Sequence, residues 1–234
     1  PVEQSTMYKD EEERQRMREA SLINDECMDM VIHAIREGVT EKELALKVEN
    51  FFKARGCNSL GFSIVGMGKN GADPHHDADE TVLKEGDSIV IDIGAPFNHY
   101  WCDMTRTVFY KSVSEKQREV YETVRRANEA AIAKIKPGVA FKEFDLAARK
   151  VIEDAGYGEY FTHRTGHSIG MKEHEKPPVA SDCEVIARPG MVFSIEPGIY
   201  LPGQFGVRVE DLVLVTEDGV EVLNHYPKNL QIIE

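Results

Sequence analysis

The sequence lacks the features that mark membrane, disulfide-rich and nucleic-acid-binding proteins. No apolar run approaches the roughly 20 residues that a helix needs to cross a bilayer, and the N-terminal residues contain no signal-peptide core. The four cysteines, Cys27, Cys57, Cys102 and Cys183, form no Cys-x-x-Cys pair, which indicates reduced thiols and favours the cytoplasm. Basic residues are outnumbered, 28 against 41 acidic ones, so nucleic acid and acidic membrane surfaces are disfavoured as partners.

Linker-like composition is also absent. The 234 residues contain no Pro/Ser-rich stretch, no low-complexity segment and no abrupt change of composition. A chain of this length can form one large domain or two small ones. Without a linker we expect a single domain over residues 1–234.

The chain opens with a pattern that predicts a helical hairpin. Residues from about 10 to 36 have the spacing of a long amphipathic helix that ends before Gly38. Thr40 with Glu43 has the spacing of a capping box, which predicts a second helix ending near Gly56.

The same pattern returns later in the chain. Ser114 with Gln117 predicts the start of a helix that runs to about residue 136, and a second helix is expected over about residues 141–155. Seven positions of the two hairpins match at an offset of 100, namely Ile35, Gly38, Val39, Lys42, Glu43, Leu46 and Gly56 with Ile135, Gly138, Val139, Lys142, Glu143, Leu146 and Gly156.

The strand-like runs after each hairpin extend the repeat. Gly86 and Asp92 stand six residues apart before an apolar stretch, as do Gly190 and Glu196. The sequence therefore predicts two similar α/β halves that face each other across a pseudo-dyad. Coincidence between short helical segments is the alternative.

A second acidic residue follows in each half. Asp103 and Glu210 each open another strand-like run. The turn-forming residues between Tyr200 and Val207 predict a hairpin, which would bring Glu196 close to Glu210. Each half is thus expected to donate two carboxylates to a shared centre.

Five side chains are candidate ligands of two metal ions: Asp92, Asp103, His167, Glu196 and Glu210. Each carboxylate lies in or beside an apolar, β-prone run, where a lone charge is costly, and four gathered carboxylates repel one another. Two divalent cations balance four negative charges, and one imidazole among oxygen ligands suits manganese, cobalt, iron or zinc. Taken singly, each acid has a structural interpretation, such as a strand-end carboxylate paired with lysine; the set of five favours the metal site.

Five passages resemble the metal-dependent peptidases of the pita-bread fold, the family that holds methionine aminopeptidase, aminopeptidase P and prolidase. The resemblance covers nearly the whole chain, and its passages occur in the family order. The third and fourth look more like the Xaa-Pro-cleaving branch than the methionine-removing branch. The passages are Ile91-Asp92-Ile93-Gly94-Ala95, Cys102-Asp103-Met104-Thr105-Arg106-Thr107, His163-Arg164-Thr165-Gly166-His167-Ser168-Ile169-Gly170, Ile195-Glu196-Pro197-Gly198-Ile199-Tyr200 and Val207-Arg208-Val209-Glu210-Asp211.

The resemblance implies a role for each of the five candidate ligands. It makes Asp92 a ligand of one metal ion, and His167 and Glu196 ligands of the other. Asp103 and Glu210 would bridge the two ions. The implied fold is α+β, with two pseudo-symmetric α/β halves around a curved, mainly antiparallel sheet.

The resemblance also implies catalytic and supporting residues outside the ligand set. His75 matches a histidine near the substrate and leaving group, and His163 and His174 match two further active-site histidines. Arg208 matches an arginine beside the bridging glutamate, where a fixed cation orients the carboxylate. For catalysis we expect a water held between the two ions to lose a proton to Glu196 and to attack as hydroxide. Glu196 then passes the proton to the departing nitrogen.

The implied substrate is a short peptide with proline at its second position, cleaved at the Xaa-Pro bond. A bond that precedes proline is a tertiary amide without an N–H, so ordinary extended-strand recognition is impaired and a dedicated site is needed. Nucleic acid and membrane are not expected as partners, and a homodimer is compatible with the family.

The chain departs from the family pattern in one respect. Prolidases and aminopeptidases P usually carry an N-terminal domain ahead of the catalytic one, and this sequence does not contain it. The lone catalytic domain is more typical of methionine aminopeptidase, which is the nearest alternative enzyme. A pita-bread module that binds protein or RNA without catalysis is a third hypothesis, which the intact ligand set disfavours.

Overall fold

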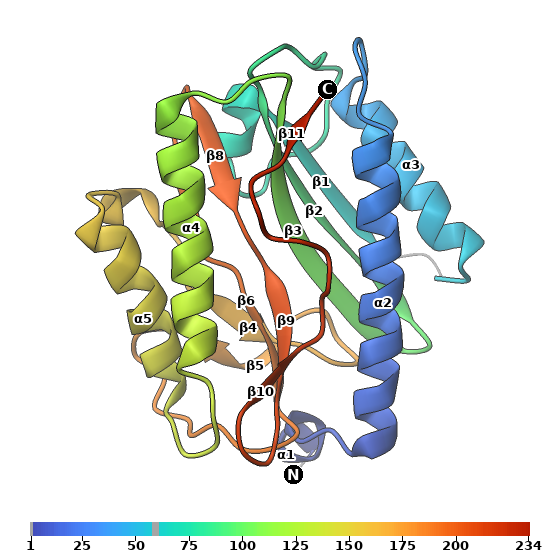
Figure 1. Ribbon diagram of the computed structural model, residues 1–234. Coiled ribbons are helices and arrows are strands. Elements are labelled where there is room, and N and C mark those ends of the chain that lie inside the picture. Colours follow the sequence, from blue (N-terminus) through green and yellow to red (C-terminus); the bar gives the residue numbers. More distant parts are fainter. Residues whose placement is uncertain (1, 58–60) are drawn as a thin grey trace.

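The computed structural model describes residues 2–57 and 61–234, and its helices and strands are shown in Figure 1. The helices are α1 (Val2–Met7), α2 (Glu11–His33), α3 (Glu41–Ala54), α4 (Glu115–Ala133) and α5 (Phe141–Asp154), with two short 3₁₀ helices, η1 (Gly68–Ala72) and η2 (Gly158–Tyr160). The strands are β1 (Phe62–Met67), β2 (Ser88–Phe97), β3 (Tyr100–Tyr110), β4 (Gly166–Ser168), β5 (Glu175–Val179), β6 (Val192–Ile195), β7 (Gly198–Leu201), β8 (Phe205–Arg208), β9 (Asp211–Val215), β10 (Val220–Val222) and β11 (Ile232–Ile233).

The two predicted helical hairpins are present, and their starts follow from capping chemistry. A reciprocal capping box holds the start of α4, between Ser114 and Gln117, as predicted. Thr40 caps α3 by accepting the N–H of Glu43 at 3.1 Å, but the Glu43 carboxylate lies 3.7 Å from Arg36 instead of closing the box. None of the helices in the described ranges is long and apolar enough to cross a membrane.

The fold is α+β with mainly antiparallel strands, as the resemblance implied, and the strands form three hydrogen-bonded sheets. Their orders are β1-β2-β3-β11, β10-β9-β6-β4-β5 and β7-β8, and every pairing is antiparallel except that of β11 with β3. Glu196 and Pro197 separate β6 from β7. Because proline has no N–H to donate, the ladder is interrupted there.

The start of β3 differs from the prediction. Asp103 was expected to open the strand, but β3 begins at Tyr100 and pairs with β2 from there. The connection is a two-residue hairpin turn at Asn98 and His99, whose φ angles are 49° and 71°. Asn tolerates this left-handed conformation, and the pair Asn98-His99 was not recognised as a turn in the sequence.

The duplication is visible in the backbone. Gly38, Gly56 and Gly86 have positive φ angles of 79°, 79° and 85°, and their counterparts Gly138, Gly156 and Gly190 have 93°, 87° and 93°. A left-handed conformation at matched glycines means that the chain turns in the same way in both halves.

The offset between the halves is not constant. It is 100 at the ends of the hairpins but 104 at the helix starts, from Asp10 to Ser114, and at the strands, from Asp92 to Glu196. The change from 104 at the helix starts to 100 at the hairpin ends follows from the length of the first helix: α2 has 23 residues and α4 has 19, a difference of about one turn. An insertion of whole turns leaves the buried face of the helix unchanged.

Each half has its own hydrophobic core, and a third cluster joins them. One core lies between α2, α3 and β1 to β3, and the other between α4, α5 and the strands of the C-terminal half. The joining cluster includes Met17, Trp101, Ile169 and Leu212. In Figure 1 the hairpin α2-α3 lies on the right and α4-α5 on the left, and the C-terminal segment runs between α2 and α4.

Candidate metal centre

A cleft of about 490 Å³ lies where the two halves meet, and most of the predicted site residues line it. Phe62, Ile64 and Pro74 provide apolar lining. The polar lining consists of His75, Asp77, Asp92, Asp103, His163, Arg164, His167, Glu173, His174, Glu196 and Arg208. Glu210 lies beneath this surface and is fully buried.

The β2-β3 hairpin places the two aspartates on one face of the sheet. Asp92 pairs with Thr105 across the ladder, and Gly94 pairs with Asp103. Since alternate residues of a strand share a face, Asp103 and Thr105 point to the same side as Asp92. Asp92 and Asp103, 11 residues apart in the sequence, are therefore diagonal neighbours on adjacent strands.

The C-terminal half supplies its ligands from strand ends. His167 lies in β4. Ile195 of β6 pairs with Asp211 of β9, so Glu196 and Glu210 lie side by side just beyond the last pair of these two strands. The predicted hairpin between the glutamates forms as β7-β8. The N–H of Glu196 donates to the carbonyl of Thr165 at 2.7 Å, which fixes this end of β6.

Ligand groups from the two halves converge. Asp103, His167 and Glu210 offer one atom each within 4.8 Å of one another. His167 Nε2 lies 3.3 Å from Asp103 Oδ2 and 3.6 Å from Glu196 Oε1. His167 Nδ1 lies 3.0 Å from the carbonyl of Ser168, which leaves Nε2 directed at the carboxylates.

Buried oxygen atoms without a partner show that the donor set fits cations. Asp92 Oδ1, Asp103 Oδ1 and Glu210 Oε1 are buried and have no hydrogen-bond partner among the described residues. A buried carboxylate oxygen is costly unless it is paired or coordinates a metal ion. One oxygen of each of three carboxylates is therefore available to a divalent cation, and oxygen ligands with one imidazole suit a first-row metal.

The electrostatics point in the same direction. Burial raises the pKa of Asp103 to about 8, with the charge of Asp92 adding to it and His167 opposing it. Burial and the charge of Asp103 also raise the pKa of Glu210. Burial alone would lower the pKa of His167, but Asp103 and Glu196 raise it to about 9. Burial thus favours the protonated forms of Asp103 and Glu210, and a bound cation would favour their charged forms.

Arg208 makes a different contact from the one implied by the resemblance. Its Nη2 donates to Asp92 Oδ2 at 2.9 Å, whereas it reaches Glu210 only through Thr105. Its Nη1 donates to the hydroxyl of Tyr200 at 3.1 Å. Arg208 ends β8, opposite the strand that carries Asp92, so its guanidinium meets that aspartate first.

The three predicted histidines lie around the cleft at different depths. His163 is half-buried, with Nε2 2.7 Å from the hydroxyl of Tyr200. The ring of His174 is exposed, and its centroid lies 4.1 Å from that of His167. His75 is exposed at the cleft wall. Burial lowers the pKa of both His163 and His174, which favours neutral rings able to accept or donate a hydrogen bond.

Sequence reasoning missed Thr105 and Tyr200. Thr105 Oγ1 donates to Glu210 Oε2 at 2.8 Å and accepts from Arg208. Its position two residues after Asp103 in a strand was a usable signal, since such residues share a face. Tyr200 ends the fourth passage of the resemblance, but its contacts with His163 and Arg208 could not be predicted, because these partners come from other segments.

Comparisons with known proteins agree with this architecture. The model of metallopeptidase family M24 matches residues 15–217. An uncharacterized peptidase of Staphylococcus aureus (strain MSSA476) is 41% identical over 228 residues, which is 97% of this chain and 65% of that protein. This chain thus spans about two thirds of the length of the relatives that it matches.

Two solved structures are similar over nearly the whole chain. The Xaa-Pro dipeptidase from Bacillus anthracis is 39% identical with a TM-score of 0.96, over 99% of this chain and 65% of that one. The prolidase from Pyrococcus furiosus is 40% identical with a TM-score of 0.92, over 96% of this chain and 67% of that one.

Proposed function

Because the chain belongs to metallopeptidase family M24, we propose that it is a peptidase that uses two divalent metal ions to hydrolyse Xaa-Pro bonds in dipeptides or at peptide N-termini. The observation that carries the proposal is the convergence of Asp103, His167 and Glu210 around buried carboxylate oxygens that have no other partner. The names of the two similar structures, an Xaa-Pro dipeptidase and a prolidase, support the proline specificity.

The proposed ligands are the five residues predicted from the sequence: Asp92, Asp103, His167, Glu196 and Glu210. Bound in pairs, divalent ions of manganese, cobalt, iron or zinc supply an activated water and polarise the scissile carbonyl. The protein's part is to fix the ligands. Arg208 holds one oxygen of Asp92 and Thr105 holds one oxygen of Glu210, so the other oxygen of each, which has no partner among the described residues, can bind an ion.

Glu196 is the proposed proton carrier of the reaction. Its side chain is 18% exposed, so it reaches the cleft, whereas Glu210 is fully buried. It can take a proton from the attacking water and deliver it to the departing imino nitrogen. Because the ring of His174 adjoins that of the proposed ligand His167, we assign to His174 the stabilisation of charge on the scissile carbonyl oxygen.

The cleft also offers a site for the proline ring. Phe62, Ile64 and Pro74 give one part of the lining apolar character. A pyrrolidine ring has no N–H to satisfy, so an apolar contact is the appropriate one. His75, which follows Pro74, is the proposed contact to the substrate near this ring.

Metal removal and substrate comparison test the proposal. Protein treated with a chelator is expected to lose hydrolysis of Ala-Pro and Gly-Pro and to recover it when manganese or cobalt is added back, with two ions per chain by elemental analysis. A longer Xaa-Pro-Xaa peptide separates dipeptidase from aminopeptidase action. Hydrolysis that survives chelation, or cleavage of a Met-Ala peptide without cleavage of Xaa-Pro bonds, would contradict it.

Two further parts of the proposal concern assembly and location. A homodimer is proposed from the family resemblance, and light scattering of the purified protein tests it. Location in the cytoplasm is supported by the free state of Cys27, Cys57, Cys102 and Cys183, all of which are buried. Thiol labelling of the unfolded protein isolated from cells should find all four reduced.

A further inference from the structure

Glu210 is held in place from the opposite half of the molecule. Its N–H donates to the carbonyl of Thr105 at 3.1 Å, and its carbonyl accepts Nη1 of Arg106 at 2.7 Å. Its Oε2 accepts the hydroxyl of Thr105 at 2.8 Å. The fourth polar atom, Oε1, is buried without a hydrogen-bond partner. The position of this free oxygen is therefore set by two consecutive residues of β3.

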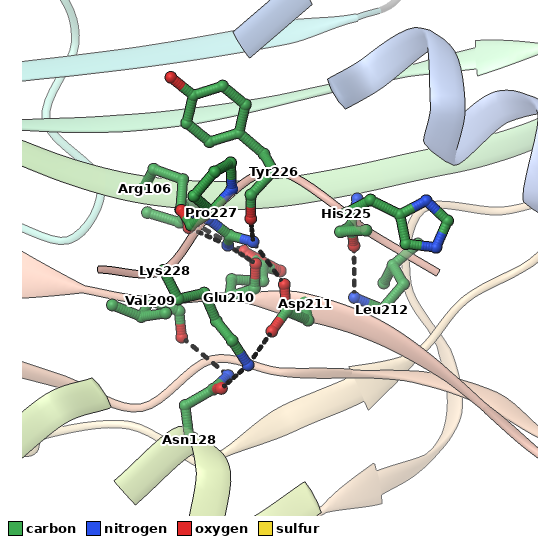
Figure 2. A network of polar contacts seen from close by, with 12 residues as sticks. Arg106, Asn128, Val209, Glu210, Asp211, Leu212, His225, Tyr226, Pro227 and Lys228 are labelled. Atoms are coloured by element: carbon green, nitrogen blue, oxygen red, sulfur yellow. Dashed lines mark hydrogen bonds and ion pairs between the residues drawn. The ribbon is translucent and has the colours of Figure 1, made fainter. Parts of the chain in front are cut away.

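Arg106 uses all of its hydrogen-bonding capacity in this arrangement. Its side chain is 2% exposed, and besides Glu210 it donates to the carbonyls of Thr105, Tyr226 and Pro227 at 2.9, 2.8 and 3.2 Å. It also pairs with Asp211 Oδ1 at 2.7 Å. These five contacts equal the five donors of a guanidinium group. Figure 2 shows Arg106 at the centre of the network.

Lys228 closes the network from the C-terminal segment. Its Nζ lies 2.9 Å from Asp211 Oδ2 and donates to Asn128 Oδ1 at 2.8 Å. Asn128, on α4, in turn donates to the carbonyls of Ile195 at 3.2 Å and Val209 at 3.4 Å, and the latter contact is drawn in Figure 2. These carbonyls belong to the residues just before Glu196 and Glu210, so the network reaches the backbone of both glutamates.

We propose that Arg106, Asp211 and Lys228 are positioning residues that set the metal affinity of the site by fixing the backbone of Glu210 and, through Asn128, that of Glu196. The C-terminal segment, through residues 226–228, thereby contributes to metal binding as well as packing against the core. The inference rests on the proposed two-metal site.

A purely stabilising role does not account for this cluster. Buried ion pairs are often no more stabilising than apolar side chains of similar volume. The contacts here reach the ligand segments, because Arg106 holds the carbonyl of Glu210 and the carboxylate of Asp211. Asn128 holds the carbonyls of Ile195 and Val209. Outer partners that orient metal ligands typically change metal affinity by about 10- to 100-fold when they are removed.

The test measures metal binding directly. Lys228 is 23% exposed, so Lys228→Met should fold, and calorimetric titration of the metal-free variant with manganese is expected to show roughly 10-fold weaker binding than wild type. The metal concentration that gives half-maximal Ala-Pro hydrolysis should rise by the same factor, while KM for Ala-Pro at saturating metal stays unchanged. Lys228→Arg is expected to restore most of the affinity.

Two further variants keep the result decisive. Asp211→Asn removes the carboxylate shared by both cations and should weaken metal binding at least as much. Arg18→Met is the matched control, because Arg18 is 32% exposed and pairs α2 with Glu221 in the other half without reaching Glu210. A fall of Tm in the Lys228 and Asp211 variants with unchanged metal affinity would overturn the inference. Failure of wild-type protein to bind manganese would instead refute the proposed function.

Discussion

The N-terminal half carries its two acids inside long paired strands, whereas the C-terminal half carries its acids at the ends of short ones. Asp92 and Asp103 lie within β2 and β3, which have 10 and 11 residues. Glu196 follows β6 and Glu210 precedes β9, which have 4 and 5 residues. The halves share a chain path but contribute differently: one supplies a face of long paired strands with short side chains, and the other supplies longer side chains beside short strands and the imidazole from β4.

The halves also hold their active-site loops by related means. In the N-terminal half, Glu41 at the start of α3 is fully buried and accepts the N–H groups of Met67 and Asp79 at 2.8 and 2.9 Å. It also contacts His76 Nε2 at 2.6 Å. The loop fixed in this way carries the neighbouring His75 to the cleft.

In the C-terminal half the corresponding carboxylate is Asp145 on α5. It is fully buried and accepts the N–H and the hydroxyl of Thr165 at 3.0 and 2.8 Å, and it pairs with Arg149. Arg149 donates to the carbonyl of His163 at 3.0 Å. Both halves therefore use a buried carboxylate of their second helix to fix a loop that carries a histidine of the cleft.

The largest effect is expected when a ligand is removed from either half. Asp103→Asn and Glu210→Gln should each lower kcat/KM for Ala-Pro by at least about 10³-fold, roughly 4 kcal/mol of transition-state stabilisation, because each leaves the ions short of a charged ligand. Asp77→Asn changes an exposed acid of the same cleft and should have a small effect. Activity retained by one of the two ligand variants would mean that the halves do not contribute equally.

The histidines offer a second contrast between the halves. His174→Ala should lower kcat by about 10²-fold with little change in metal content, because its ring adjoins His167 but takes no part in the ligand set. His75→Ala should act mainly on KM, since His75 lies at the cleft wall. Steady-state kinetics with metal analysis of both variants checks this. Unchanged turnover of His174→Ala would defeat its assignment.

The pH dependence of stability tests the junction between the halves. The raised pKa values of Asp103, about 8, and His167, about 9, mean that the metal-free folded state binds more protons than the unfolded state. Its stability should therefore fall as the pH rises from about 5 to 9. Thermal unfolding with chelator present measures this decline, and Asp103→Asn should flatten it. A metal-free Tm that rises over this range would contradict the expected sign.

Neutralising either of the buried carboxylates that fix the cleft loops, Glu41 or Asp145, should destabilise the fold by a similar amount. Glu41→Gln and Asp145→Asn each keep the side-chain volume but weaken several bonds to a buried charge, so each should destabilise the fold by roughly 2 kcal/mol. Chemical denaturation gives the values. Glu49→Gln, in an exposed pair with Lys53, serves as the control and should change stability by less than about 0.5 kcal/mol.

The smallest effect concerns an unequal pair of helix caps. Thr40 caps α3, but its counterpart Ala140 gives α5 no side-chain cap. Ala140 has φ −72° and ψ 143°, which suits a capping residue. Ala140→Thr should stabilise the protein by about 1 kcal/mol and Thr40→Ala should destabilise it by a similar amount. The first variant should raise Tm by roughly 2 to 4 °C and the second should lower it by a similar amount. A change of Tm in the same direction for both would contradict the difference in capping between the two helices.

The sequence predicted those parts of the fold that depend on local pattern. The helical hairpins, their caps at Thr40 and Ser114, the turn between β7 and β8 and the pseudo-symmetry followed from periodicity and turn chemistry. The early start of β3 was missed because Asn98-His99 is an uncommon turn. The separation of β7-β8 from the sheet that contains β6 depends on where Pro197 interrupts the ladder.

The site shows the same division between local and distant information. Residue types and order pointed to Asp103, His167 and Glu210, which converge in the structure. The contact of Arg208 with Asp92 and the roles of Glu41 and Lys228 depend on which distant segments meet. Such contacts leave no periodic trace in one sequence, because a hydrogen bond between residues 100 positions apart imposes no spacing on either segment.

The division of the ligands between the halves has a consequence for the newly made chain. Residues up to Tyr110 contain only two of the five proposed ligands, and the other three arrive with the second half. A nascent chain of that length cannot assemble the centre, and neither can a molecule whose halves have folded without docking. Under the proposed function, hydrolysis of peptides therefore requires both halves to be folded and docked.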